Sequence, residues 1–215
     1  MYKLYNVTAW GSLGLHCLLE EMDVPYTNIW MTADQVRAPE FRDINPLGQV
    51  PALGLSDGRS LYESAAIVSF LIAAHPDKGM SPVLGSPDYG DFMSLLHFMS
   101  TEIYPTVSLS FGGSIYTNTD EADAFLAERA QERAESYWEL IARRLASSGP
   151  WLMGEAFSAL DLYAFMLTLW SRPSEAALHA LFPAIAKHAA AVRARPRLTA
   201  VLETHGVLAV GGYPA

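Results

Sequence analysis

The chain has 215 residues, of which 51% are hydrophobic and 17% are charged, which is typical of a globular protein with one large or two small domains. Its net charge of −9 and lack of a basic cluster exclude nucleic acid as an expected partner, because phosphate binding needs clustered Lys and Arg. No apolar run is long enough to span a membrane, no signal peptide is evident, and the single cysteine, Cys17, excludes a disulfide and a multi-cysteine metal site. We therefore expect a cytoplasmic protein with no membrane partner and no metal.

Strand and helix signals alternate in the first part of the chain. Short apolar and aromatic runs predict strands over 2–7 and 25–31, and the apolar stretch between them predicts a helix over 13–22. After a polar loop, two further strands over 51–55 and 60–62 flank Ser-Asp-Gly-Arg, a good hairpin loop. A helix over 63–74 completes the order β-α-β, loop, β-β-α.

The second part of the chain shows no strand pattern. Residues 75–88 contain three prolines and two glycines, which is typical of a linker. Beyond them, length and periodicity predict helices over 89–111, 121–146, 158–169 and 176–193. We expect an α/β domain over 1–76, a linker over 77–88 and an all-helical domain over 89–215.

Two motifs near the end of the first domain indicate a family. The first is NPLGQVPAL (45–53), whose Pro51 lacks the N–H that a sheet ladder needs, and the second is Tyr-Glu-Ser-Ala-Ala-Ile (62–67). In this order and separation they resemble the signatures of glutathione transferases. The resemblance implies a thioredoxin-like N-terminal domain followed by an all-α C-terminal domain.

The same resemblance implies how glutathione would be held. The Val50–Pro51 peptide bond would be cis, with Gln49 beside it, and the backbone N–H and C=O of Val50 would pair with the cysteinyl backbone of glutathione like an added strand. Glu63 and Ser64 stand where a strand gives way to a helix, whose N-terminus offers free N–H groups to a carboxylate. They would bind the γ-glutamyl end, although Ser64 can also serve as an N-cap.

The catalytic group is less evident from the sequence. When the chain is aligned through Pro25–Tyr26, Ala9 falls where theta-like members carry a catalytic serine, and Gly11 falls where beta-class members carry a cysteine. The remaining candidates for stabilising the glutathione thiolate are Ser12, at the start of the first helix, and Tyr104, at the position of a beta-class pocket histidine. The sequence leaves open whether Ser12 contacts sulfur or only caps its helix.

Four aromatic residues are candidates for the wall of an electrophile pocket, although aromatic residues at helical spacing are more often core residues: Trp10, Phe111, Tyr116 and Trp170. Ser158-Ala159-Leu160-Asp161 resembles the capping motif of the sixth helix of the family, which implies a structural role for Asp161.

The resemblance implies a homodimeric, detoxifying glutathione transferase that adds glutathione, its co-substrate, to a hydrophobic electrophilic small molecule. Two alternatives remain, because the usual donors at positions 9 and 11 are absent. The chain would then be a binding or interaction module that kept the fold, or a disulfide reductase in which glutathione supplies the reacting sulfur.

Overall fold

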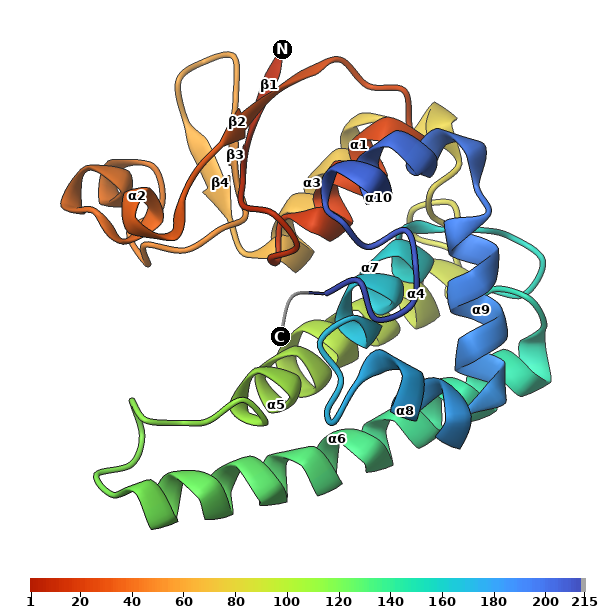
Figure 1. The fold of residues 1–215 in the computed structure, drawn as a ribbon. Helices are drawn as coiled ribbons and strands as arrows, with labels where there is room; N and C mark the ends of the chain where they lie inside the picture. Colours follow the sequence, from red (N-terminus) through yellow and green to blue (C-terminus); the bar gives the residue numbers. More distant parts are fainter. Residues whose placement is uncertain (214–215) are drawn as a thin grey trace.

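The computed structural model describes residues 1–213 and contains a four-stranded mixed sheet near the N-terminus (Figure 1). The strands lie in the order β2-β1-β3-β4, with β1 parallel to β2 and with β3 antiparallel to both β1 and β4. Their bounds are Tyr2–Asn6 for β1, Tyr26–Trp30 for β2, Ala52–Gly54 for β3 and Ser60–Tyr62 for β4. The observed element order agrees with the predicted thioredoxin-like layout.

The two faces of this sheet pack against different helices. Because side chains alternate along a strand, Leu4, Leu53 and Leu61 lie on one face, in register across β1, β3 and β4, and join the main core with α1 and α3. The side chain of Ala52 lies on the other face of the sheet, where it packs with Phe41 in a smaller hydrophobic cluster. The helical segments of this part are α1 Leu13–Glu21, α2 Ala33–Arg37, the 3₁₀ turn η1 Pro39–Asp43, α3 Ser64–Ala74 and the 3₁₀ turn η2 Pro76–Lys78.

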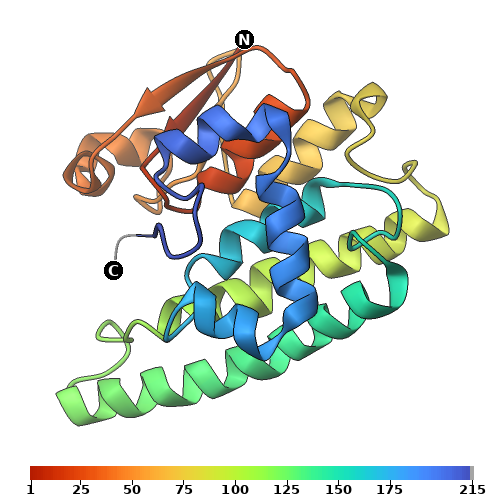
Figure 2. The same ribbon diagram turned by 45° about the vertical axis from the view of Figure 1, so that its right-hand side comes forward.

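The rest of the described chain is helical and is organised around α7, whose ten residues are all buried. Helix α7 packs against α1, α4 and α9 (Figures 1 and 2). Its start is fixed by Asp161, which accepts hydrogen bonds from the N–H of Ser158 at 2.8 Å and from the N–H of Leu152 at 2.9 Å, as the capping motif predicted. The helical elements are α4 Pro87–Phe98, the π-helix η3 Met99–Ile103, α5 Tyr104–Leu109, α6 Asp120–Ser148, α7 Ala159–Thr168, α8 Glu175–Leu181, α9 Pro183–Arg193, the 3₁₀ turn η4 Pro196–Leu198 and α10 Thr199–Thr204.

Two of the predicted helices are interrupted. The helix predicted over 89–111 contains the π-helical turn η3, which directly precedes Tyr104. The helix predicted over 176–193 is two helices, because Phe182 has φ −126° and ψ 84°. Proline disfavours the helical conformation of the residue before it, and Pro183 therefore ends α8 and begins α9.

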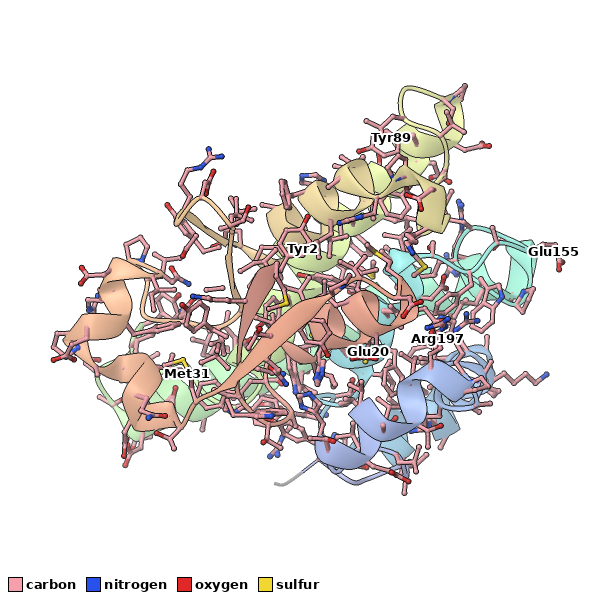
Figure 3. The ribbon with its side chains drawn as sticks, turned by 90° about the horizontal axis from the view of Figure 1, so that it is seen from above. Tyr2, Glu20, Met31, Tyr89, Glu155 and Arg197 are labelled. Atoms are coloured by element: carbon pink, nitrogen blue, oxygen red, sulfur yellow. The ribbon has the colours of Figure 1, made fainter. Side chains whose placement is uncertain are left out.

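The chain returns to the first domain after α9, and α10 packs against α1 (Figures 1 and 2). Two ion pairs join these segments, Arg195 to Glu21 at 2.5 Å and Arg197 to Asp23 at 3.5 Å. Seen from above, Arg197 lies beside the helix that carries Glu20 (Figure 3). None of the helices within residues 1–213 combines the length and apolar character that crossing a membrane requires.

Candidate active site

A cavity of about 840 Å³ lies between the sheet-bearing part and the helical part. Its first wall comes from the loop after β1, from α2 and η1, from the segment before β3 and from the residue before α3. Its second wall comes from η3, α5 and the segment after α7, with Tyr213 near the end of the described chain. The lining residues are Trp10, Gly11, Val36, Arg37, Arg42, Leu47, Gly48, Gln49, Val50, Glu63, Ser100, Tyr104, Pro105, Ser108, Phe111, Trp170 and Tyr213.

The segment before β3 presents backbone groups to this cavity. The Val50–Pro51 peptide bond is cis. Asn45 braces the segment: its side chain donates to the carbonyl of Gln49 at 2.6 Å and accepts from the N–H of Leu47 at 3.0 Å. Within residues 1–213 the backbone N–H and C=O of Val50 take part in no hydrogen bond, so both are free to pair with an extended ligand.

Glu63 and Ser64 stand at the start of α3, as predicted. Glu63 lines the cavity and has φ +67°, a conformation that non-glycine residues rarely adopt and that is common at functional sites. Ser64 is buried just behind it, and its hydroxyl lies 2.7 Å from the hydroxyl of Tyr163 on α7. Burial raises the pKa of Tyr163, so this phenol stays protonated and can donate to Ser64, which leaves the serine O–H free to donate to a ligand.

Ser12 does not contribute its hydroxyl to the cavity. Its side chain is fully buried, donates to Asn6 Oδ1 and accepts from the N–H of Val7 at 3.2 Å. It makes no side-chain cap to α1 either. This corrects the expectation that the hydroxyl either faces sulfur or caps the helix: the buried Asn6 offers a stronger partner than the cavity does, because buried polar groups must be paired.

Tyr104 lies where the missing side chain at position 11 would be. A Cβ atom built on Gly11 would overlap the Tyr104 hydroxyl and would lie 3.4 Å from the carbonyl oxygen of Val50. The phenol ring stacks on Trp170, with ring centroids 5.2 Å apart. Burial, together with the negative charge of Glu63, raises the pKa of Tyr104 to about 12, so this hydroxyl is a protonated donor at neutral pH.

Three of the four aromatic residues predicted for the pocket line the cavity: Trp10, Phe111 and Trp170. Tyr116 does not, because the chain leaves the cavity after Phe111 through Gly112 and Gly113, and Tyr116 is 72% exposed in the connection to α6. Trp170 has a second contact, since its indole N–H donates to the carbonyl of Ala9 at 3.0 Å.

Among the cavity residues that sequence reasoning missed are Arg37, Arg42 and Tyr213. Arg37, at the end of α2, and Arg42, in η1, lie in the segment that was expected to be a polar loop, and they bring two positive charges to the first wall. Tyr213 reaches the cavity because the chain returns after α9, and nothing in its Gly-rich surroundings signals that return. Within residues 1–213 no three His, Cys, Asp or Glu side chains cluster as metal ligands.

Fold and cavity together define a class: a thioredoxin-like domain with a cis-proline segment at its edge, joined to an all-α domain that closes the cavity. The comparisons with known proteins agree. The family model described as the glutathione S-transferase N-terminal domain matches residues 12–74, and the model of the glutathione S-transferase C-terminal domain matches residues 107–205. The chain belongs to the glutathione S-transferase family.

Several bacterial proteins are similar over most of the chain. It is 27% identical over 173 residues to the uncharacterised GST-like protein YncG of Escherichia coli, covering 79% of this chain and 82% of that protein. It is 24% identical over 169 residues to glutathione S-transferase GST-4.5 of Xanthomonas campestris, with the same coverage. A sphingomonad glutathione S-transferase solved in complex with glutathione is 28% identical, with a TM-score of 0.80 and coverage of 95% of this chain and 99% of that one.

Proposed function

We propose that this protein binds glutathione in the cavity and uses the Tyr104 hydroxyl to stabilise its thiolate for transfer to a hydrophobic electrophile. One observation carries the proposal: the phenol fills the space beside Gly11, next to the free carbonyl of Val50. A donor there compensates for the side chains that Ala9 and Gly11 lack. The glutathione bound by the sphingomonad relative supports the choice of ligand.

The polar groups of the first wall suit the parts of glutathione. The free N–H and C=O of Val50 would pair with the cysteinyl backbone, with Gln49 and Pro51 fixing the direction of the segment. The γ-glutamyl carboxylate would lie at the start of α3, where the Ser64 hydroxyl and free N–H groups donate, and Glu63 would hold the ammonium group. Bound in this way, the peptide would direct its thiol toward Gly11 and the Tyr104 hydroxyl.

The chemistry needs a thiolate. A free thiol has a pKa of roughly 8.5 and is mostly protonated at neutral pH, so preferential binding of the anion is required. Tyr104 can supply it because its raised pKa keeps the O–H in place as a donor, and a hydrogen bond to a charged group contributes about 1.5–3 kcal/mol. The thiol proton leaves to solvent, and sulfur then forms a bond to the electrophilic carbon as the leaving group departs with its electron pair.

The second wall of the cavity suits an apolar electrophile. Trp10, Phe111 and Trp170 present aromatic surface next to the Tyr104 hydroxyl. Such rings bury apolar area and stack on planar groups, so an aromatic or otherwise hydrophobic electrophile fits best. We also propose the symmetric, cytoplasmic homodimer that the family resemblance implies.

One alternative is supported by an observation. Ala9 and Gly11 carry no donor side chain, so the chain would be a glutathione-binding module if Tyr104 does not act on sulfur. Retention on a glutathione column together with no activity on any thiol-reactive compound would favour the module.

The test is an ultraviolet titration of the thiolate of bound glutathione. Tyr104→Phe should raise the thiol pKa by about one to two units, since each unit corresponds to about 1.4 kcal/mol of lost preference for the anion. Tyr116→Phe is a matched control, because that tyrosine is exposed outside the cavity, and it should leave the titration unchanged. Ser12→Ala should also leave the thiol pKa unchanged. An unaltered titration in Tyr104→Phe, with glutathione still bound, would refute the assignment.

A further inference from the structure

The loop between β1 and α1 is held in an unfavourable conformation by two side chains from the second half of the chain. Ala9, in this loop, has φ +58°. For a residue with a Cβ atom this left-handed conformation is unfavourable, because Cβ lies too close to the following carbonyl oxygen. Its carbonyl accepts from the indole of Trp170 at 3.0 Å, and its N–H donates to Nδ1 of His205 at 2.8 Å. Trp170 lines the cavity, whereas His205 is buried outside it.

The second ring nitrogen of His205 extends this contact into α1. Because a backbone N–H can only donate, Nδ1 of His205 is an acceptor and the neutral ring carries its proton on Nε2. Nε2 lies 2.9 Å from Nδ1 of His16 and therefore donates to it. The Asn6 amide nitrogen lies 3.2 Å from the same His16 Nδ1, whose single lone pair the two donors share, and Asn6 Oδ1 accepts from Ser12. The donor and the acceptor are therefore defined for each hydrogen bond of this buried network of His205, His16, Asn6 and Ser12.

The surroundings of His205 keep this ring in place. It is 1% exposed and packs on the rings of His16 and Trp30, each with centroids 5.2 Å away. Burial, and then the neighbouring His16, lower the pKa of His205 to about 3, so the ring is neutral at physiological pH and Nδ1 stays available to Ala9.

We propose that His205 is a positioning residue for the active site: its Nδ1 holds the Ala9 N–H and thereby keeps Gly11 against the Tyr104 hydroxyl. Gly11 is two residues beyond Ala9, and relaxation of Ala9 to a negative φ would change the path of the backbone through Trp10 and Gly11 and so displace Gly11 from the Tyr104 hydroxyl. His205 does not touch glutathione. The inference rests on the proposed function for its effect on the thiol, but the contact itself can be measured without ligand.

Two substitutions separate the two nitrogens of the ring. In His205→Asn, Oδ1 stands near the position of Nδ1, so the acceptor for Ala9 is kept and the contact with His16 is lost. In His205→Gln, the amide reaches the position of Nε2, so the contact with His16 is kept and the Ala9 N–H is left unpaired. Both variants remove the ring from the same buried position, so each is the matched control of the other.

The first measurement is amide hydrogen exchange over residues 8–12 in the free protein. His205→Gln should speed exchange about tenfold, and His205→Asn should stay near the wild-type rate, because only the former strands the amide. The second measurement is the ultraviolet titration of bound glutathione, in which the thiol pKa should rise in His205→Gln and not in His205→Asn. If His205 had only a structural role, the faster amide exchange and the raised thiol pKa would both scale with the loss of thermal stability of each variant. Which ring nitrogen the new side chain replaces would then make no difference. Equal effects in the two variants, or the reverse order, would overturn the proposal.

A third measurement needs no variant and stays decisive if either substitution prevents folding. Nitrogen-15 spectra of the histidine rings in the wild-type protein should show His205 neutral, protonated on Nε2 and unprotonated on Nδ1. Protonation on Nδ1 would refute the contact with Ala9. If exchange and tautomer agree with the proposal while Tyr104→Phe leaves the thiol pKa unchanged, the proposed function fails and the positioning of the loop stands.

Discussion

Gly11→Ala tests most directly whether the Tyr104 hydroxyl occupies the place of the missing side chain. The added Cβ would overlap that hydroxyl, while its next contacts, with Tyr104 Cζ and the Val50 carbonyl oxygen, would be at 3.4 Å. The phenol must therefore move, although it is stacked on Trp170. Overpacking of this kind costs about 1–3 kcal/mol of unfolding free energy.

Gly11→Ala should cost little unfolding free energy once the Tyr104 hydroxyl has been removed. In a Tyr104→Phe background the closest remaining contacts are those at 3.4 Å, which need a shift of only a few tenths of an ångström. Gly11 does not have a positive φ, so alanine adds no backbone strain there, and it lowers the entropy of the unfolded chain by about 0.4–1 kcal/mol. We expect a coupling energy of about 1–3 kcal/mol between the two substitutions.

The assay is a double-mutant cycle of denaturant unfolding on the wild type, the two single variants and the double variant. Gly90→Ala is the control: this glycine lies exposed in α4 with nothing within 4 Å of an added Cβ, so alanine should stabilise the protein by about 0.5–1 kcal/mol. Gly11→Ala should also raise the pKa of the bound thiol, because the donor is displaced. A coupling energy below about 0.5 kcal/mol would refute the placement of the hydroxyl.

Three further predictions concern Ser64, the buried histidines and the oligomeric state. Ser64→Ala should weaken glutathione binding by about 1–3 kcal/mol and also reduce stability, because the Tyr163 hydroxyl loses its partner; calorimetry showing unchanged affinity would remove Ser64 from the site. Burial lowers the pKa of His16 to about 4 and that of His205 to about 3, from 6.5, so the unfolded chain binds more protons below 6.5 and stability should fall as pH falls. Between about pH 7 and pH 5 each histidine should account for roughly 2 kcal/mol, and a His16→Gln variant with the same pH slope as the wild type would contradict this. Light scattering should give the mass of a homodimer, and a monomer at micromolar concentration would rule out the symmetric pairing.

Much of the fold could be predicted from local sequence. The alternation of strands and helices in the first 75 residues follows from periodicity and turn residues, and the capping motif at Ser158 predicted the start of α7. The helix break before Pro183 could also have been predicted, since proline restricts the backbone of the residue before it. The π-helical turn before Tyr104 was not, because no residue pattern in 99–103 distinguishes it from an α-helix.

The candidate site also has a part that local sequence predicts and a part that it does not. Val50 and Glu63 line the cavity, and Pro51 and Ser64 directly follow them, because each pair is set by a turn or a helix start within a few residues of its own sequence position. Which hydroxyl faces the cavity was decided by tertiary contacts: the Ser12 hydroxyl is turned inward by the buried Asn6, whose amide contacts His16, and His16 in turn contacts the distant His205.

Tyr104 reaches the cavity for the same reason. Its ring stacks on Trp170, which in turn holds the carbonyl of Ala9, and the space for its hydroxyl exists because position 11 has no side chain. Local sequence determines backbone geometry because turns and caps involve neighbouring residues, whereas the direction of a buried polar side chain depends on which partner can satisfy it, and the partners of this loop come from the far end of the chain.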